Sequence, residues 1–364
     1  LLREIIAAVR ASTDEHFIIG LRISADERDP EGLTEDESLL AVQALQTSLD
    51  YVHIVAGTSA SLGGAVHIVP PMAIEAAYLA REAGTFKAGL SIPLFVTGRI
   101  NQPQEAELIL ARGQADVCGM TRALICDPQM PNKTDSGRVE DVRACIACNQ
   151  ACIGHFHKGL PISCIQHPET GRELIFGIRQ PTGQRKRIMI AGGGPAGMKA
   201  AAVAAQRGHE VTLYEAAAQL GGQVLLAQLL PRRSEFGGAS TNLQREMELA
   251  GVRVVRNTRV DRALVERERP DLVIIATGAE PYWPTFERGG ELQVVDAWQV
   301  LRDEVQIGRS VVVVDWRCDW IGPGIAERLV RAGHQVHLAV NGTHCGENLP
   351  LYVRDQLAGE LHKL

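Results

Sequence analysis

The chain has 364 residues, of which 45% are hydrophobic, 4% aromatic and 22% charged, and its formal net charge is −6. This length allows two or three domains with sizeable cores, and the acidic balance argues against nucleic acid or an anionic membrane as a partner. With no apolar run long enough to span a bilayer and no signal-peptide pattern, the sequence predicts a cytoplasmic α/β protein.

Residues 1–138 alternate strand-like and helical stretches. Strands are expected at 17–23, 51–56, 93–97 and 115–120, and helices at 35–47, 72–88 and 103–111. This alternation predicts a parallel sheet with right-handed crossovers, either doubly wound or part of a (β/α)8 barrel. The residues after the last strands favour the barrel, because barrel enzymes keep their chemistry at the strand ends.

Two of these strand ends suit a phosphate group. They read Gly98-Arg99 and Gly119-Met120-Thr121-Arg122. Backbone N–H groups near a helix start, helped by a guanidinium, bind a phosphate dianion. The alternative is that both arginines form surface salt bridges, but their matching positions favour phosphate binding.

Four cysteines crowd residues 139–176, at Cys145, Cys148, Cys152 and Cys164. Four thiolates this close in sequence are typical of an iron–sulfur cluster. Zinc accepts the same ligands, although structural zinc sites favour two separate CxxC pairs. A disulfide pair or reduced bystander thiols is a further alternative, which would need an oxidising compartment to form the disulfide. The spacing favours a [4Fe-4S] cluster.

Residues 177–186 are expected to form a linker, and a nucleotide-binding domain is expected at 187–300. A strand at 187–191 runs into Gly192-Gly193-Gly194-Pro195-Ala196-Gly197, a helix follows at 198–207, and a second strand at 210–214 ends at Glu215. A glycine-rich turn in this context lets a pyrophosphate approach the helix, and the acid accepts from ribose hydroxyls. The sequence therefore predicts a dinucleotide site.

A second, partial nucleotide-binding-type subdomain is expected at 301–364. Its strand, residues 310–314, should lead into a glycine-rich loop if it binds NAD(P)H. The chain instead continues with Asp315, Trp316, Asp319 and Trp320. Negative charge and bulk at this place disfavour a pyrophosphate. The alternative is a divergent loop that binds the nucleotide in another way.

Three segments carry a resemblance to a known family. Residues 20–24, 96–100 and 119–128, followed by the cysteine run and the glycine-rich turn, resemble the multidomain branch of the Old Yellow Enzyme-type NADH:flavin oxidoreductases. That branch includes trimethylamine dehydrogenase, 2,4-dienoyl-CoA reductase and the N-methylproline or dimethylglycine demethylases. The resemblance implies the C-terminal half of a (β/α)8 FMN barrel (strands 5–8), an iron–sulfur segment and a Rossmann-like domain. It also implies truncation at both ends, with four earlier strands and a closing segment expected outside the chain.

The resemblance also assigns residues to cofactors. Arg22 would face the flavin ring of FMN, and the phosphate would lie among Gly98, Arg99, Met120, Thr121 and Arg122. The cluster ligands would be the four cysteines. FAD, or ADP alone, would bind at Gly192, Gly194, Ala196, Gly197, Glu215, Gly222, Gln223, Arg233 and Val260. The main catalytic residues are expected upstream of this chain. His53 and His67 are the remaining candidates for substrate contact or proton transfer, against the alternative of ordinary hydrogen-bonded histidines.

The leading hypothesis is oxidative demethylation of a methylated amine such as dimethylglycine or N-methylproline. FMN accepts a hydride equivalent, the iminium product hydrolyses, and electrons pass through the cluster to a protein acceptor such as an electron-transferring flavoprotein. One alternative is an NAD(P)H-dependent enoate or 2,4-dienoyl-CoA reductase. Another is an electron-transfer module without its own substrate site. The piece alone is expected to be inactive, and a homo-oligomer is left open.

Overall fold

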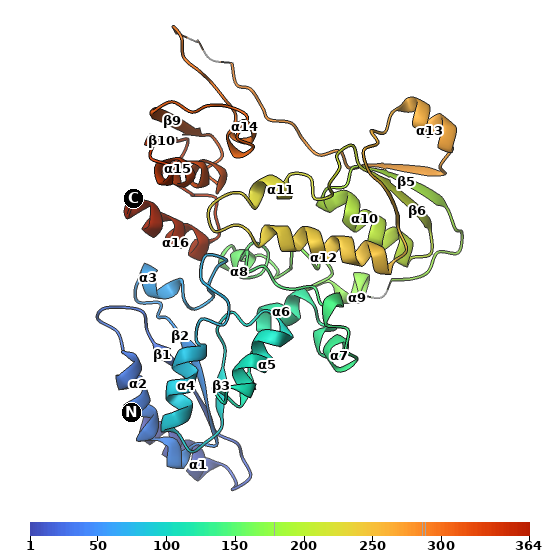
Figure 1. Ribbon diagram of the computed structural model, residues 1–364. Coiled ribbons are helices and arrows are strands. Elements are labelled where there is room, and N and C mark those ends of the chain that lie inside the picture. The colour runs from blue at the N-terminus through green and yellow to red at the C-terminus, as the bar shows by residue number, and fades with distance from the viewer. Residues whose placement is uncertain (178, 286, 288) are drawn as a thin grey trace. The chain divides into compact units, whose positions relative to one another are not determined.

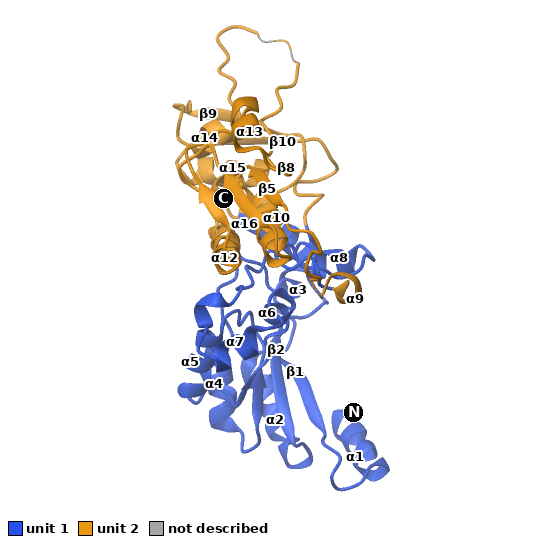
Figure 2. Ribbon diagram, turned by 90° about the vertical axis from the view of Figure 1, so that its right-hand side faces the viewer, with its two compact units in different colours: residues 1–170, 350–360 blue, residues 171–349, 361–364 orange. Residues whose placement is uncertain are grey.

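The computed structural model describes residues 1–177, 179–285, 287 and 289–364. Residue 178 of the expected linker lies outside this range. The chain divides into two compact units, shown in Figure 2. Unit 1 contains residues 1–170 and 350–360, and unit 2 contains residues 171–349 and 361–364. No helix in the described ranges is both long and apolar enough to cross a membrane.

Unit 1 is built on a four-stranded parallel sheet with strand order β1-β2-β3-β4. Sequential parallel strands joined by helices are the arrangement of consecutive strands in a (β/α)8 barrel. The strands are β1 (Gly20–Asp26), β2 (Tyr51–Ala56), β3 (Leu94–Val96) and β4 (Val117–Cys118). The helices are α1 (Leu2–Ser12), α2 (Glu35–Gln43), α3 (Leu62–Ala65), α4 (Ala80–Gly89), α5 (Pro103–Ala111), α6 (Thr121–Cys126), α7 (Met130–Asp135), α8 (Ile153–His157) and α16 (Leu351–His362), with 3-10 turns η1 (Gln46–Ser48) and η2 (Val139–Asp141).

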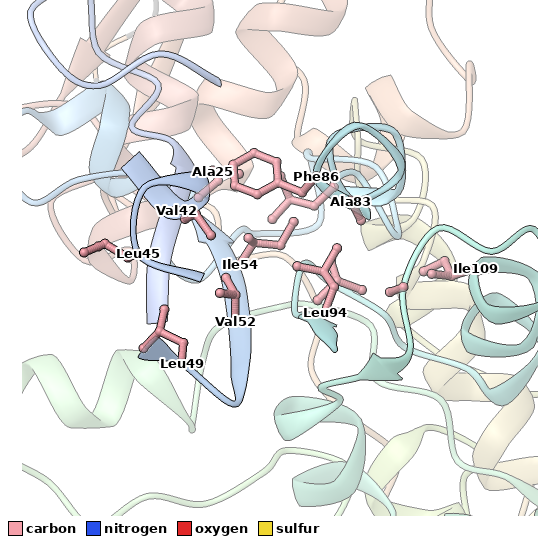
Figure 3. Packing of buried hydrophobic residues seen from close by; sticks show 14 of the residues in the cluster. Ala25, Val42, Leu45, Leu49, Val52, Ile54, Ala83, Phe86, Leu94 and Ile109 are labelled. Atoms are coloured by element: carbon pink, nitrogen blue, oxygen red, sulfur yellow. The ribbon is translucent and has the colours of Figure 1, made fainter. Parts of the chain in front are cut away.

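The core of unit 1 lies between the sheet and its helices. In β2, alternate residues Val52 and Ile54 are fully buried, so one face of the strand meets the helices and the other carries His53. Figure 3 shows Ile54 together with Leu94 of β3 and Phe86 of α4 in this cluster. The strands thereby present their polar residues on the face opposite the core.

The helix expected at 35–47 ends at Gln43, and the strands expected at 93–97 and 115–120 are shorter, Leu94–Val96 and Val117–Cys118. Two further elements of unit 1 begin at least three residues later than expected. The first strand begins at Gly20 instead of residue 17, because the Phe17 N–H donates to the Asp14 carbonyl in a turn. The helix expected at 72–88 begins only at Ala80. Ala77 has a left-handed φ of 51° and its N–H donates to the carbonyl of Arg99 at 3.0 Å, so the backbone turns there.

Unit 2 holds a second parallel sheet, with strand order β7-β6-β5-β8. Helices α10 and α12 pack against each other beside it (Figure 1). Ile190, Leu213, Met198 and Met247 fill the core between sheet and helices. The strands are β5 (Arg187–Ala191), β6 (Glu210–Tyr214), β7 (Arg253–Val255) and β8 (Leu272–Ile275). The helices are α9 (Glu173–Phe176), α10 (Pro195–Gln206), α11 (Val224–Ala227), α12 (Phe236–Leu249) and α13 (Arg262–Glu268).

A smaller β-α-β element completes unit 2. Strands β9 (Ser310–Asp315) and β10 (Gln335–Val340) pair in parallel and are joined by α15 (Ile321–Arg331), and α14 (Ala297–Leu301) precedes them. Val311 and Val313 pack in the apolar cluster on one face. On the other face of β9, Val312 is 65% exposed and Val314 71% exposed.

Candidate functional site

The polar face of the unit 1 sheet brings Arg22 and His53 together. They are register partners on β1 and β2, and the His53 Nε2 atom shares a hydrogen bond with Thr97 Oγ1 at 2.8 Å, just past β3. Burial and the positive charge of Arg22 lower the pKa of His53. The imidazole is therefore mostly neutral at pH 7 and is able to accept a proton.

His67 lies beyond the end of β2 in a different setting. The Tyr78 hydroxyl donates to its backbone carbonyl at 2.8 Å, and the two rings lie 5.8 Å apart. Its Nδ1 atom is buried without a hydrogen-bond partner among the described residues. Burial and the charge of Arg28 lower the pKa of His67, against the opposing effect of Asp26. His67 thus presents a second neutral imidazole at the strand ends.

The predicted phosphate-binding residues follow β3 and β4, which are adjacent parallel strands. Gly98 and Arg99 come directly after β3, and Arg99 is buried with a left-handed φ of 53°. Met120 precedes α6, and Thr121 and Arg122 form its first turn. These residues therefore share one edge of the sheet, as a common site requires.

Arg122 also reaches the cysteine segment. Its Nη1 atom donates to the Pro70 carbonyl and to Asn149 Oδ1, both at 2.7 Å. Asn149 lies between Cys148 and Cys152 and donates from Nδ2 to the carbonyl of Val69 at 2.8 Å. The predicted phosphate edge and the cysteine loop are therefore joined by side-chain hydrogen bonds.

The loop from Cys145 to Cys152 folds so that backbone N–H groups face the sulfurs. Ala147 and Asn149 both adopt left-handed φ values, and the Ala147 N–H donates to Cys145 Sγ at 3.4 Å. The sulfurs of Cys148 and Cys152 also accept backbone N–H groups, from Gln150 and Ile153. Hydrogen bonds to the sulfurs are a feature of protein iron–sulfur sites.

The fourth cysteine, Cys164, is held in the same manner by the N–H groups of Gln166 and His167. Burial raises the pKa values of Cys145, Cys148 and Cys152. A hydrogen bond from Cys126 lowers the pKa of Cys164 to about 6, despite burial. Cys145, Cys148 and Cys152 are each affected by the charge of Cys164, so the four thiols lie in one neighbourhood.

No group of three or more His, Cys, Asp or Glu side chains in the described ranges has the spacing of a bound metal ion. The assignment of a cluster therefore stays a prediction. The chemistry of the donor set fits it, because four neighbouring thiols with backbone N–H donors are what a [4Fe-4S] centre needs.

Sequence reasoning missed three residues around this loop. Cys126 is 1% exposed, and the Cys164 thiol next to it raises its pKa. Asp127, also 1% exposed, accepts from Lys133 Nζ at 2.6 Å and from the N–H of Arg143 at 2.8 Å. Asn149 bridges to the barrel part. The sequence signal for Cys126 was its position as a further cysteine shortly before the run from Cys145 to Cys164.

In unit 2 the glycine-rich turn closes on Glu215. Gly192 has a φ of 111°, and the Gly193 N–H donates to Glu215 Oε2 at 2.6 Å. A side chain at Gly197 would overlap the Gly192 carbonyl, whereas a Cβ at Gly194 would meet open space. Helix and strand therefore approach closely behind the turn, while its front is open, as a bound pyrophosphate requires.

The remaining predicted nucleotide residues spread around this turn. Gly222, with a φ of 53°, lies against Gly194, and Gln223 Nε2 donates to the carbonyl of Ala279 at 3.0 Å. Val260 packs in a small cluster with Tyr214. Ala196 is exposed in the first turn of α10, and the Arg233 guanidinium lies 4.5 Å from the ring centre of Trp320.

The loop between β9 and α15 is organised by two aspartates. Asp315 is 4% exposed, and its Oδ1 atom accepts the N–H groups of Arg317 at 3.2 Å and Cys318 at 3.0 Å. Asp319 Oδ1 accepts the N–H of Ile321 at 2.9 Å. Burial raises the pKa of Asp315. Carboxylates thus occupy backbone donors at the place where a second pyrophosphate would bind.

A cavity of about 440 Å³ lies on the α12 side of unit 2. It shares Leu220 with the glycine-rich turn, since a Cβ at Gly193 would touch that side chain. Its lining is mainly polar and includes Gln219, Leu220, Gln228, Ser240, Gln244 and Arg256.

Comparisons with known proteins find similar sequences and a similar fold. The chain is 34% identical over 349 residues to N,N-dimethylglycine/sarcosine dehydrogenase of Chromohalobacter salexigens, covering 93% of this chain and 50% of the relative. It is 34% identical over 338 residues to the probable N-methylproline demethylase of Rhizobium meliloti, covering 92% and 50%. A solved complex of 2-naphthoyl-CoA reductase with 2-naphthoyl-CoA aligns with a TM-score of 0.91 at 27% identity, covering 100% of this chain and 55% of that one.

The chain thus spans about half the length of the relatives it matches. Residues 1–141 match the NADH:flavin oxidoreductase / NADH oxidase family, whose fold here is the barrel part of unit 1. Residues 186–363 match the pyridine nucleotide-disulphide oxidoreductase family. The chain therefore joins a domain of the NADH:flavin oxidoreductase / NADH oxidase family to a domain of the pyridine nucleotide-disulphide oxidoreductase family.

Proposed function

We propose that this chain forms part of an oxidoreductase that demethylates a methylated amine and delivers the electrons to a protein acceptor. FMN would be held by Arg22, Gly98, Arg99, Met120, Thr121 and Arg122, the cluster by Cys145, Cys148, Cys152 and Cys164, and FAD or ADP at the glycine-rich turn near Glu215. When bound, FMN supplies hydride acceptance and the cluster supplies single-electron transfer.

Two observations support an amine as the substrate. The relatives named above include a dimethylglycine/sarcosine dehydrogenase and a probable N-methylproline demethylase. The polar sheet face also carries His53, whose pKa burial and Arg22 hold low. A neutral imidazole can accept a hydrogen bond from a substrate N–H group, and only the free amine has the lone pair that stabilises an iminium product.

The single observation that carries the electron route is the Asp315 carboxylate. It accepts two backbone N–H groups of its own loop, at 3.2 and 3.0 Å. A pyridine nucleotide would need those donors for its pyrophosphate and would meet negative charge from Asp315 and Asp319 instead. This supports an electron-transferring flavoprotein, rather than NAD(P)H, as the redox partner.

The test is anaerobic stopped-flow absorbance on the whole oxidoreductase of which this chain forms part, isolated with its flavin, because the piece alone is expected to be inactive. We expect dimethylglycine to bleach the flavin and NADPH to leave it oxidised. The trimethylated analogue is the matched control, because a quaternary nitrogen has no lone pair and cannot form the iminium. Rapid bleaching by NADPH, with none by methylated amines, would overturn the proposal.

A second candidate, an NAD(P)H-dependent enoate or acyl-CoA reductase, is favoured by one finding. The whole chain aligns with the 2-naphthoyl-CoA reductase structure at a TM-score of 0.91. This candidate predicts NADPH binding at the β9–α15 loop in spite of Asp315. Isothermal titration of NADPH into the protein distinguishes the two candidate functions. The amine dehydrogenase proposal expects no heat of NADPH binding, because Asp315 occupies the backbone donors of the β9–α15 loop. Flavin that responds to neither donor would favour an electron-transfer module.

A further inference from the structure

The cavity of about 440 Å³ in unit 2 lies between α11 and the first half of α12, two helices that pack against each other (Figure 1). Leu225 belongs to α11, several residues of 237–244 belong to α12, and Arg256 follows the end of β7. Cavities of about 300–1,000 Å³ hold small molecules. Among the described residues that line it, Leu220 and Leu225 have apolar side chains, and the rest are polar or glycine. The cavity therefore suits a hydrophilic ligand.

Arg256 gives this cavity a positive charge that no acid in its lining offsets. The described residues that line it include neither aspartate nor glutamate. The Arg256 guanidinium is exposed and has no hydrogen bond or ion pair within the described part of the chain. A guanidinium presents five N–H donors in a fork that matches the oxygens of a phosphate or carboxylate. The charge of the cavity therefore favours an anion.

Amide and hydroxyl groups surround the rest of the cavity. The side chains of Gln219, Gln228 and Ser234 make no hydrogen bond within the described ranges. Ser240 is 3% exposed and its Oγ atom accepts from Gln244 Nε2 at 3.2 Å, while no described group accepts its hydroxyl hydrogen. Amides and hydroxyls both donate and accept, as the hydroxyl groups of a polyol do. The lining therefore offers partners for a hydroxyl-rich molecule.

The cavity adjoins the glycine-rich turn but is lined by different residues. The Gly221 N–H donates to the carbonyl of Gly193 at 2.9 Å, and a Cβ at Gly221 would approach Ser240 Oγ to 2.9 Å. Leu220 likewise touches both the turn and the cavity. None of the residues predicted to bind FAD or ADP lines the cavity. A ligand in the cavity would therefore be a neighbour of the nucleotide, held by its own side chains.

We propose that this cavity binds an anionic, hydroxyl-rich small molecule of the sugar phosphate class, at a site separate from the predicted nucleotide site. Arg256 pairs with the phosphate, whose oxygens are strong acceptors. Gln219, Gln228 and Ser240 hydrogen-bond the remaining oxygens and the hydroxyl groups of the sugar. The inference goes beyond the proposed function and does not depend on amine oxidation or on the cluster.

The experiment is isothermal titration of glucose 6-phosphate into the whole oxidoreductase of which this chain forms part, in phosphate-free buffer with ADP in excess. We expect saturable binding, weakened about tenfold or more in Arg256→Gln, which removes a charged hydrogen-bond donor. Arg253→Gln is the matched control, because Arg253 is exposed at the start of the same strand and does not line the cavity. It should bind as the wild type does. Ser240→Ala should weaken binding without a change of charge.

Two further titrations test the class of ligand. Inorganic phosphate and glucose, each alone, should bind more weakly than glucose 6-phosphate, because each lacks half of the contacts. Inorganic phosphate that binds as tightly as the ester would overturn the sugar phosphate assignment and leave a simple anion site.

Other outcomes would overturn the site itself. These are no binding by the wild type, equal weakening in Arg253→Gln and Arg256→Gln, or binding that excess ADP abolishes, which would make the cavity part of the nucleotide site. Thermal melts of all variants are recorded first. If Arg256→Gln does not fold, wild-type affinity in Ser240→Ala contradicts the proposal. Flavin bleaching by dimethylglycine is measured separately, so failure of this site and failure of the proposed function are distinguishable.

Discussion

Arg122 donates from Nη1 to the Oδ1 atom of Asn149 at 2.7 Å. Asn149 extends the chain of contacts by donating to the carbonyl of Val69, and Arg122 donates to the neighbouring carbonyl of Pro70. A residue predicted to bind the FMN phosphate therefore supports the loop predicted to hold the cluster. A substitution at either residue should therefore affect both the predicted phosphate site and the cysteine loop.

Asn149→Ala is expected to destabilise unit 1 by about 2 kcal/mol, because it leaves the Arg122 and Val69 groups without this partner and places alanine at a left-handed φ of 57°. Urea unfolding measures the loss. Asn149→Gly tolerates the φ and so isolates the hydrogen bonds, while Asn132→Ala, on exposed α7, is the control. A Gly variant as stable as the wild type would mean that the bridge contributes nothing.

Asp127→Asn should cost about 3 kcal/mol at neutral pH, because it breaks a largely buried ion pair with Lys133. Burial opposes ionisation, yet the Lys133 and Arg143 contacts lower the pKa of Asp127 overall. A carboxyl with a lowered folded pKa stabilises above its unfolded value of about 3.9 and loses this contribution as pH falls through the folded pKa.

Urea unfolding at neutral and acid pH tests the sign of this effect. The gap between wild type and Asp127→Asn should narrow on acidification. Asp135→Asn, at an exposed position of α7, is the control and should unfold at neutral pH as the wild type does. An Asp127→Asn variant that keeps the same deficit in acid would contradict the ionic explanation.

His53 should make unit 1 less stable in mild acid. Burial and Arg22 lower its folded pKa, while in the unfolded chain it titrates near about 6.5. The folded state then holds fewer protons below that pH, so stability falls as pH falls from about 6.5 towards the folded pKa. His53→Gln, which can still hydrogen-bond Thr97, should lose less stability between about pH 7.5 and about pH 5.5. Equal losses in both proteins would argue against a depressed pKa.

Alanine substitutions at Gly194 and Gly197 should have different effects, one on nucleotide binding and the other on thermal stability. Gly197→Ala places a Cβ against the Gly192 carbonyl and should lower the melting temperature of unit 2, with or without ligand. Gly194→Ala meets open space in the protein, so it should melt as the wild type does but bind FAD or ADP more weakly. Thermal melts and isothermal titration with each nucleotide measure both effects. Unchanged nucleotide affinity in Gly194→Ala would move the pyrophosphate away from this turn.

Local patterns were sufficient for much of the fold. The strand at Tyr51–Ala56 and the helix at Pro103–Ala111 have the expected bounds. The strand alternates strictly between buried and half-buried residues, and the helix starts with proline and a Gln102/Glu105 capping box. The expected helix at 72–88 was wrong over its first half, because the Ala77 N–H donates to the carbonyl of Arg99 in a distant segment.

The candidate site was harder to predict from the sequence, because its contacts also join residues that are distant in the chain. Asn149 and Val69 are 80 positions apart, and no local pattern connects an asparagine inside a cysteine loop to a carbonyl beyond a strand. Cys126 lacked the spacing of a ligand and gained its interest only from the fold around Cys164. Gly193, Glu215 and their hydrogen bond follow a local motif, and the strand–turn–helix context is the part that sequence predicts well.

The open face of β9 has a practical consequence for handling the protein. Val312 and Val314, within a run of four consecutive valines, are 65% and 71% exposed, and Trp316, just past the strand, is 70% exposed. Short β-branched segments without charge nucleate intermolecular sheets when they are uncovered. Concentrated samples of this chain should therefore aggregate through this ribbon, and a lysine at position 312 or 314 should keep them in solution.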